Sequence, residues 1–382
     1  MYSIAGYGSM IADQIRTEAY ARALQSVIRP DSVVADIGSG TGILSFLACQ
    51  FGARRVFALE PDDSIQVARE IARANGFDDR IEFIQELSTN VTLPERADVI
   101  VSDLRGILPP FQRHLPSIMD ARARHLKHDG KLIPQRDTMW AAVVEAPEAY
   151  GKLVDPWSGN DFKLDMSAAQ RRVLNTFTKV RLKPEALLTE PHCWASLDYT
   201  RVESPNIVGS FSASLRRVGT AHGILVWFDS VLLQGIGFSN SPHAPELIYG
   251  STFFPWLEPV VAEAGDHVTL ELQANLVGED YVWCWRSRVL AGGNSSTVRA
   301  DFDQSSFFGV PVVPGQLHKR ATNHLPVLNE EAEVDRFILT LMGTGITVAE
   351  IAARVQERFP DRIRQFRDAL TRVGDLSKKY SR

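Results

Sequence analysis

A glycine-rich turn near the N-terminus constrains the fold more than any other stretch of this chain. The apolar run Val33–Ile37 carries the acid Asp36, and glycines follow at alternate positions, Gly38, Gly40 and Gly42. A helix-like pattern begins directly afterwards. A strand, a tight turn and a helix start together bring backbone N–H groups close to a ligand at the helix N-terminus. The sequence therefore predicts a nucleotide-type site in an α/β domain.

The choice of ligand depends on the glycine spacing and on the nearby acids. Dinucleotide sites favour G-x-G-x-x-G, in which the third glycine comes one position later than here. The next apolar run, 55–59, is followed by Glu60, which is placed to hold the hydroxyl pair of a ribose. S-adenosylmethionine (SAM) carries positive charge and no phosphate, so acids near the turn favour it. We expect SAM; NAD and a ligand-free turn are the alternatives.

Composition places the chain among ordinary globular proteins. Its 382 residues suffice for two or three domains, and 45% are hydrophobic and 23% charged. The net charge of −5 argues against nucleic acid as a general partner, and no apolar run reaches the roughly 18 residues of a membrane span. No signal peptide is indicated. Cys49, Cys193 and Cys284 are too scattered for a C-x-x-C metal site and too few for a disulfide framework, which favours a reducing, cytoplasmic location.

Strand and helix patterns alternate up to about residue 135, which indicates an open, mostly parallel sheet. A helix is predicted over 8–27, before the first strand. Strands are predicted at 33–37, 55–59, 81–85, 98–102 and 131–133. The second half shows strand-like runs instead, at 138–145, 176–183, 191–202, 206–217, 223–237, 266–276 and 281–290.

The N-terminal helix carries a resemblance to a known family. Its stretch from Met10 through Asp13, Arg16 and Thr17 to Tyr20 resembles the M-x-x-D-x-x-R-T-x-x-Y helix of the protein arginine methyltransferases. The glycine turn has the spacing of class I methyltransferases in general. Segments 129–137, 155–167 and 237–254 resemble the family's domain junction, its dimerisation arm and part of its barrel. The similarity covers about residues 10–290.

The resemblance implies a fold, a cofactor and an oligomer. We expect a Rossmann-like SAM-binding domain with an N-terminal helix over 1–135, and a β-barrel domain over 136–315 with a dimerisation arm at about 155–190. A homodimer follows from the arm. The resemblance assigns Arg16 to the carboxylate of SAM and Ser88 and Thr89 to its adenine. The cofactor-binding candidates are then Met10, Arg16, Asp36, Gly38, Gly40, Gly42, Glu60, Ser88 and Thr89.

The loop after the fourth strand departs from the family pattern. In the family it carries two glutamates that hold the substrate guanidinium; here Asp103 and Gln112 fill those positions. The family's T-H-W loop falls on 247–249, where none of its three residues is present. A guanidinium keeps its charge, and one carboxylate with a neutral amide neutralises it less well than two carboxylates. An oxygen or a weakly basic nitrogen needs orientation and one base, and the candidates are Asp103 and His114.

Two arginines in the same loop are harder to interpret. Arg105 and Arg113 could pair with an anionic acceptor, but solvated loop charges are the expected role. The catalytic candidates are therefore Asp103, Gln112 and His114.

Residues 316–382 are interpreted as a linker and a small helical domain. The segment 291–326 is rich in Gly, Ser and Pro and is predicted to close the barrel and to lead into this domain. An apolar stripe over 328–341, a capping box from Thr347 to Glu350 and the segment 362–373 predict three helices. The region is loosely similar to small domains that bind leader peptides in bacterial peptide-modification pathways, and to half of a helix-turn-helix.

The sequence thus predicts an α/β + β protein: a Rossmann-like methyltransferase sheet, a β-barrel domain and a small helical C-terminal domain. The resemblance implies SAM-dependent methyl transfer to a peptide, protein or natural-product acceptor bound between sheet domain and barrel. The altered loop favours an acceptor other than a standard arginine. Genuine arginine N-methylation and a catalytically silent SAM-binding scaffold are the alternatives.

Overall fold

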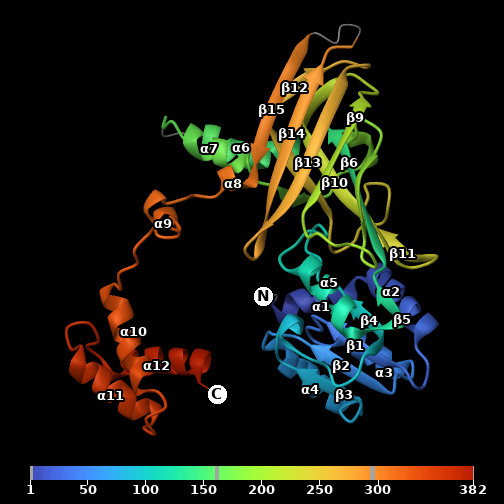
Figure 1. Cartoon of the computed structure of the whole chain (residues 1–382). Helices are drawn as coiled ribbons and strands as arrows, with labels where there is room; N and C mark the ends of the chain where they lie inside the picture. Colours follow the sequence, from blue (N-terminus) through green and yellow to red (C-terminus); the bar gives the residue numbers. More distant parts are fainter. Residues whose placement is uncertain (1–2, 160–162, 293–296, 382) are drawn as a thin grey trace. The chain divides into compact units, whose positions relative to one another are not determined.

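The computed structural model describes residues 3–159, 163–292 and 297–381. The chain divides into two compact units, Met1–Pro311 and Val312–Arg382, which are described separately (Figure 1). The sequence predicts the corresponding boundary between 315 and 316, a few residues later.

The first part of the larger unit is a five-stranded parallel sheet in the order β3-β2-β1-β4-β5. Its strands are β1 (Val33–Ile37), β2 (Arg55–Leu59), β3 (Ile81–Ile84), β4 (Ala97–Ser102) and β5 (Leu126–Ile133). Its helices are α1 (Ile4–Ala12), α2 (Gln14–Val27), α3 (Ile43–Gln50), α4 (Ser64–Ala74), the 3-10 turn η1 (Ser88–Asn90) and α5 (His114–His125). β1 is buried along its whole length, as expected for a central strand covered on both faces. Its neighbours are β2 and β4, so the chain order reverses beside β1, where ligands bind in open α/β sheets.

The strand predictions for this sheet are confirmed, except that β5 begins at Leu126, earlier than expected. The single helix predicted over 8–27 is wrong, because the chain forms α1 and α2 with a break at Asp13. The Asp13 carboxylate accepts a hydrogen bond from the backbone N–H of Arg16 at 3.1 Å and thereby caps α2. The break fixes the direction in which α2 leaves α1.

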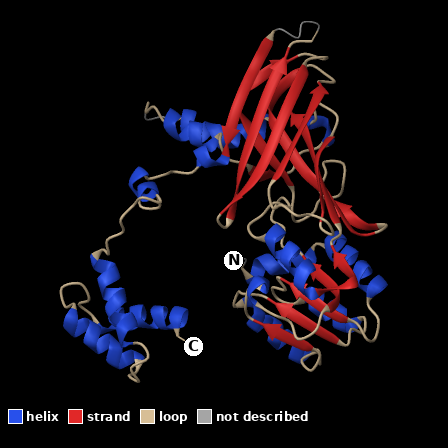
Figure 2. Cartoon of the chain, viewed as in Figure 1, coloured by secondary structure: helices blue, strands red, loops and turns tan. Residues whose placement is uncertain are grey.

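The second part of the larger unit is antiparallel. One sheet has the order β7-β12-β10-β6-β8 with β11 beside β10, and the other has the order β15-β14-β13-β9. The two sheets adjoin each other, because β8 contacts β9 and β12 contacts β15 (Figure 2). The region predicted to be a β-barrel thus consists of two antiparallel sheets. The strands are β6 (Arg136–Val144), β7 (Thr178–Val180), β8 (His192–Asp198), β9 (Ile207–Ser214), β10 (Gly219–Leu233), β11 (Ile236–Ser239), β12 (Ser251–Ala262), β13 (His267–Val277), β14 (Asp280–Leu290) and β15 (Val298–Ser305).

Two segments of this part add detail to the sequence prediction. The segment 291–326, predicted to close the barrel and to lead into the helical domain, contains β15, which pairs with β14 and turns Ala300, Phe302 and Gln304 inward. The alternating pattern of β15 is short and mostly polar, and Gly and Ser residues precede it in the sequence, so no strand was predicted there. The expected arm region holds α6 (Pro147–Ser158), α7 (Ser167–Val173) and the 3-10 turn η2 (Pro184–Ala186). Phe162 of the expected arm lies outside the described residues.

The short helix α8 (Ser306–Gly309) follows β15, and α9 (Pro314–His318) lies at the start of the second unit. The rest of that unit is helical (Figure 2), with α10 (Glu330–Leu341), α11 (Val348–Arg358) and α12 (Phe366–Tyr380). These three helices share a small hydrophobic core. The capping box of Thr347 and Glu350 is confirmed at the start of α11. The third helix begins at Phe366 and not at 362. Throughout the described part of the chain, none of the helices has the length and apolar character needed to cross a bilayer.

Candidate functional site

A cavity of about 570 Å³ lies at the carboxyl ends of β1, β2 and β4. It is enclosed by α1, the glycine turn, the loop after β4 and the turn between β13 and β14. It brings together many of the predicted site residues: Met10, Arg16, Gly38, Glu60, Ser88, Asp103, Gln112 and His114. Among the described residues, Asp36, Gly40, Gly42 and Thr89 lie outside its lining.

The glycine turn is built so that only glycine fits. Gly38, Gly40 and Gly42 have φ angles of +73°, +54° and +92°, which residues with a Cβ rarely adopt. A Cβ on Gly38 would lie 2.1 Å from the Leu104 side chain, and one on Gly40 would lie 2.4 Å from the Tyr7 ring. The backbone of the turn can therefore approach its neighbours, and a ligand in the cavity, more closely than other residues would allow.

Two buried acids flank the turn. Glu60 accepts hydrogen bonds from the backbone N–H groups of Gly40 at 2.9 Å and of Asp62 at 3.0 Å, and burial raises its pKa. Asp36 accepts one from the Ser45 hydroxyl at 2.7 Å, while its Oδ1 has no partner in the described structure. Burial raises the pKa of Asp36 to about 7. A cation beside this pair would favour the charged carboxylates, which fits the sulfonium and ammonium groups of SAM.

Arg16, expected to meet the SAM carboxylate, is ion-paired with Asp103. The distance from Asp103 Oδ2 is 2.5 Å to Nη2 of Arg16 and 2.6 Å to its Nε. Arg16 also donates from Nη1 to the backbone oxygen of Met10 at 3.2 Å. The hydroxyl of Tyr249 donates to Oδ2 of Asp103 at 2.5 Å. Residues from α2, the loop after β4 and the segment before β12 thus meet at one carboxylate.

The second oxygen of Asp103 is occupied by Arg105. Nε of Arg105 donates to Oδ1 of Asp103 at 3.0 Å, and Nη1 of Arg105 donates to Oδ1 of Asp137 at 3.1 Å. The hydroxyl of Tyr199 donates to the other oxygen of Asp137 at 2.6 Å. The expectation that Arg105 is a solvated loop charge is wrong, because its side chain is 0% exposed. Asp137, on β6, is the second carboxylate that holds Arg105. Its position in the sequence, 32 residues after Arg105, gave no indication of this contact.

The hypothesis that Asp103 is a general base does not fit this geometry. Burial alone would raise the pKa of Asp103, but Arg16, Arg105 and the Tyr249 hydroxyl outweigh burial and lower that pKa to about 2. A carboxylate stabilised in this way accepts a proton poorly at neutral pH. Asp103 therefore connects α2 to the loop after β4, and its charge is neutralised within the protein.

His114 is the other candidate base. A carbonyl oxygen can only accept, so the 2.8 Å contact between Nδ1 and the oxygen of Pro109 places the proton on Nδ1. Nε2 then carries the lone pair, and it is buried without a hydrogen-bond partner in the described structure. Burial lowers the pKa of His114 to about 4, so the ring is neutral at pH 7. Gln112 is exposed beside it, with a φ angle of +42°.

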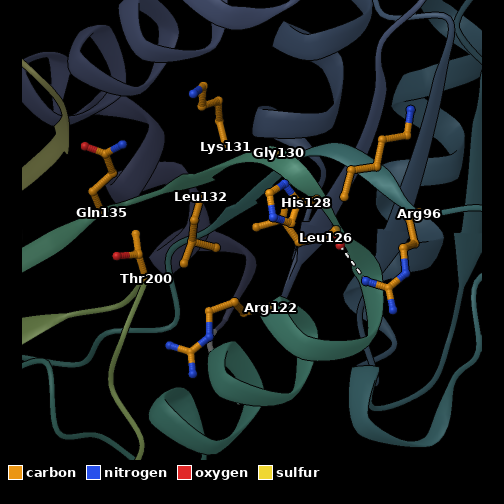
Figure 3. Close-up of a pocket in the computed structure, with 10 residues that line it drawn as sticks. Arg96, Arg122, Leu126, His128, Gly130, Lys131, Leu132, Gln135 and Thr200 are labelled. Carbon is orange, nitrogen blue, oxygen red and sulfur yellow. Dashed lines mark hydrogen bonds between the residues drawn. The ribbon is translucent and has the colours of Figure 1, made fainter.

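Arg113, the other arginine of this loop, is partly exposed as expected. It is also paired, because its Nη1 lies 3.0 Å from Oε1 of Glu279 in the turn between β13 and β14. A second hollow of about 450 Å³ lies at β5, with basic side chains around it (Figure 3). Arg96 there donates to the backbone oxygen of Leu126, and Arg122 donates to that of Tyr199. These cations have structural partners, so the cavity beside the glycine turn is the candidate functional site.

The chain is similar to known proteins over most of its length. Residues 16–134 match the family model described as ribosomal protein L11 methyltransferase (PrmA). Residues 135–281 match the arginine methyltransferase oligomerization subdomain. Protein arginine N-methyltransferase 6 of Xenopus tropicalis is 32% identical over 282 residues, which are 70% of this chain and 82% of that protein.

Solved structures are similar in fold. The Trypanosoma brucei PRMT1 enzyme-prozyme heterotetrameric complex with AdoHcy has a TM-score of 0.70 and 23% identity, covering 78% of this chain and 96% of that chain. Protein arginine methyltransferase 10 of Arabidopsis thaliana has a TM-score of 0.69 and 22% identity, covering 79% of this chain and 97% of that chain.

Proposed function

This chain belongs to the protein arginine N-methyltransferase family, and we propose that it nevertheless transfers the methyl group of SAM to an acceptor other than an arginine side chain. Family membership makes the chain a SAM-dependent methyltransferase with SAM as its cofactor. The choice of acceptor is the proposal. One observation supports it: Asp103 is already paired with Arg16 and Arg105 of the same chain.

A guanidinium acceptor would have to compete with these internal cations. Arg16, Arg105, Asp103 and Asp137 carry two positive and two negative charges, so the cluster is neutral as it stands. Gln112 offers an amide and no second carboxylate. Adding a buried guanidinium would leave a positive charge without a counterion, which is costly away from water. An acceptor that enters uncharged has no such cost.

The residues of the cavity suit the parts of SAM. When bound, SAM supplies a methyl group on a sulfonium, from which a nucleophile can take it. We assign Arg16 to the carboxylate of SAM, Glu60 to its ribose hydroxyls and the backbone of the glycine turn to close contact with it. Met10, Asp36, Ser88 and Thr89 remain proposals as further contacts of the cofactor.

The acceptor side is assigned to Gln112 and His114. The lone pair on Nε2 of His114 can accept a hydrogen bond from an N–H or O–H group, and with a pKa of about 4 the ring is a weak base. The Gln112 amide can both donate and accept, which orients an uncharged nitrogen or oxygen. The acceptor class is thus an uncharged N–H or O–H group of a peptide, protein or natural product. Arginine N-methylation is the second candidate function, favoured by the names of the relatives.

Replacing Arg16 with alanine is expected to weaken SAM binding roughly thirtyfold, about 2 kcal/mol for a charged hydrogen-bonded pair. 5′-Methylthioadenosine lacks the amino-acid part of SAM, so its affinity should change little. Calorimetry with both ligands measures the difference. Arg22→Ala, on the exposed side of the same helix, is the matched control. Equal loss for both ligands would exclude the assignment of Arg16 to the carboxylate.

Gln112→Glu separates the two acceptor classes. With an uncharged acceptor, the new carboxylate removes an N–H donor and adds charge, and the rate of methyl transfer should fall about tenfold. With arginine, the second carboxylate should raise the rate. The measurement is the initial rate of transfer from labelled SAM to an extract of the source organism, and Gln316→Glu adds the same charge on an exposed helix as a control. A faster Gln112→Glu variant would favour arginine.

A homodimer and a cytoplasmic location complete the proposal. Residues 135–281 resemble an oligomerization subdomain, and the neighbouring rings of Phe307 and Phe308 in α8 are exposed. Exposed apolar side chains that lie together favour a covering partner. Sedimentation at micromolar concentration should show a dimer, and a monomer would contradict it. The three free thiols suit a reducing compartment.

A further inference from the structure

The Arg105 guanidinium is buried, and all three of its nitrogens are hydrogen-bonded to residues of the surrounding elements. Its Nε donates to Oδ1 of Asp103 at 3.0 Å, and its Nη1 donates to Oδ1 of Asp137 at 3.1 Å and to Oγ of Ser230 at 2.7 Å. Its Nη2 donates to the hydroxyl of Tyr20. Each nitrogen therefore has a partner, and the side chain is 0% exposed. Two carboxylates on different sides of a planar cation form the pattern by which proteins recognise guanidinium groups.

Aromatic rings complete the enclosure. The Cζ atom of Arg105 lies 5.3–6.0 Å from the ring centroids of four aromatic residues, within the range of cation–π attraction. These rings come from α2, β10, β11 and the segment before β12. We call the whole set the Arg105 cage: Tyr20, Asp103, Asp137, Phe228, Ser230, Phe238 and Tyr249.

We infer that the Arg105 cage is a guanidinium-binding site that the chain fills with its own side chain, so that Arg105 keeps an arginine from outside out of the acceptor site. Arg105 comes from the loop between β4 and α5, whereas most of the cage walls lie on helices and strands. Apart from Asp103, which shares the loop of Arg105, the walls are thus on parts of the backbone separate from the ligand. Arg105 also lines the cavity that holds Gln112 and His114, so the cage adjoins the acceptor side. The consequence for the acceptor rests on the proposed function, but binding of guanidinium by the cage does not.

The test is whether an emptied cage binds guanidinium from solution. In Arg105→Ala the walls remain while the internal ligand is lost. The melting temperature of this full-length variant should rise by about 3 °C in millimolar guanidinium chloride relative to sodium chloride, by mass action. Urea has the same planar shape without charge and should give no rise. The wild type, with its cage filled, should not respond to either compound.

A second variant keeps the test decisive if Arg105→Ala folds poorly. Arg105→Ala leaves two buried carboxylates without the cation that Arg105 supplied. Arg105→Ala/Asp137→Asn removes one of these negative charges, so it should fold more readily than Arg105→Ala. It retains Asp103 and should still prefer guanidinium to urea, with about tenfold weaker affinity than Arg105→Ala. This ligand preference distinguishes a binding site from a merely structural ion pair, which would gain equally from both compounds or from neither.

The outcomes also separate this inference from the proposed function. If the folded variants show no preference for guanidinium over urea, the cage is not a guanidinium site, and the proposed acceptor class still stands on the pairing of Asp103. If the wild type methylates arginine, the proposed acceptor class fails whatever the cage binds.

Discussion

Replacing Asp137 with alanine is expected to lower the free energy of unfolding by about 3–5 kcal/mol, the loss found when one partner of a buried ion pair is removed. The reason is that Arg105 would keep its charge with one counterion fewer in a dry environment. Asp137 is 0% exposed and accepts from both Arg105 and the Tyr199 hydroxyl, so two buried donors would lose a partner. Denaturant unfolding monitored by intrinsic fluorescence measures the change.

Glu82→Ala is the matched control for this prediction. Glu82 pairs with Arg55 at 2.5 Å, but both side chains are well exposed, at 45% and 38%. Water replaces such a partner, and the expected loss is below about 1 kcal/mol. A similar small loss for Asp137→Ala would mean that the Arg105 ion pair is solvated and that the description of a dry, neutral cluster is wrong.

Acid is expected to destabilise the protein through His114 by about 3 kcal/mol between pH 7 and pH 4, and by about 2 kcal/mol already at pH 5. Burial, with the nearby Arg105 charge, lowers the pKa of His114 from 6.5 to about 4. Between these values the unfolded chain binds a proton that the folded chain does not. Stability from His114 is therefore complete above pH 6.5 and is lost as the pH falls from 6.5 to 4.

The measurement is the difference in free energy of unfolding between the wild type and His114→Phe at each pH. Asp36 has a raised pKa and acts in the opposite direction, and His125 and His222 have lowered pKa values like His114. The difference between the two proteins cancels these contributions. It should change by the stated amount, and a difference that is constant with pH would place His114 in contact with water.

The glycine turn and the acid beside it could be predicted because their signals are local in sequence. The glycines at 38, 40 and 42 need positive φ angles within one turn, and Glu60 follows the next strand directly. Strands β1, β2 and β4 of the parallel sheet are likewise short, mostly buried apolar runs, which the sequence pattern alone predicts. The break at Asp13 was missed because the apolar pattern continues across it, although Asp13 is a typical N-cap residue.

The acceptor half could not be predicted in the same way. Asp103 and Arg105 are neighbours in sequence, but Asp137 lies on β6, Ser230 on β10 and Tyr249 before β12. Only the packing of the antiparallel sheets against the parallel sheet brings them together. In a sequence, a buried ion pair and two solvated loop charges look alike. The substitution of Asp103 and Gln112 at the family's two glutamates indicated that the acceptor site had changed, but not that Arg105 had entered it.

The position of the transferred methyl group decides between an uncharged acceptor and arginine. The wild-type chain is incubated with isotope-labelled SAM and an extract of the source organism, together with arginine-rich peptides, and the labelled products are fragmented by tandem mass spectrometry. We expect label on an uncharged nitrogen or oxygen and no methylarginine above a reaction without enzyme. Abundant labelled methylarginine would contradict it, because an acceptor guanidinium would then have gained the carboxylates that Arg16 and Arg105 occupy.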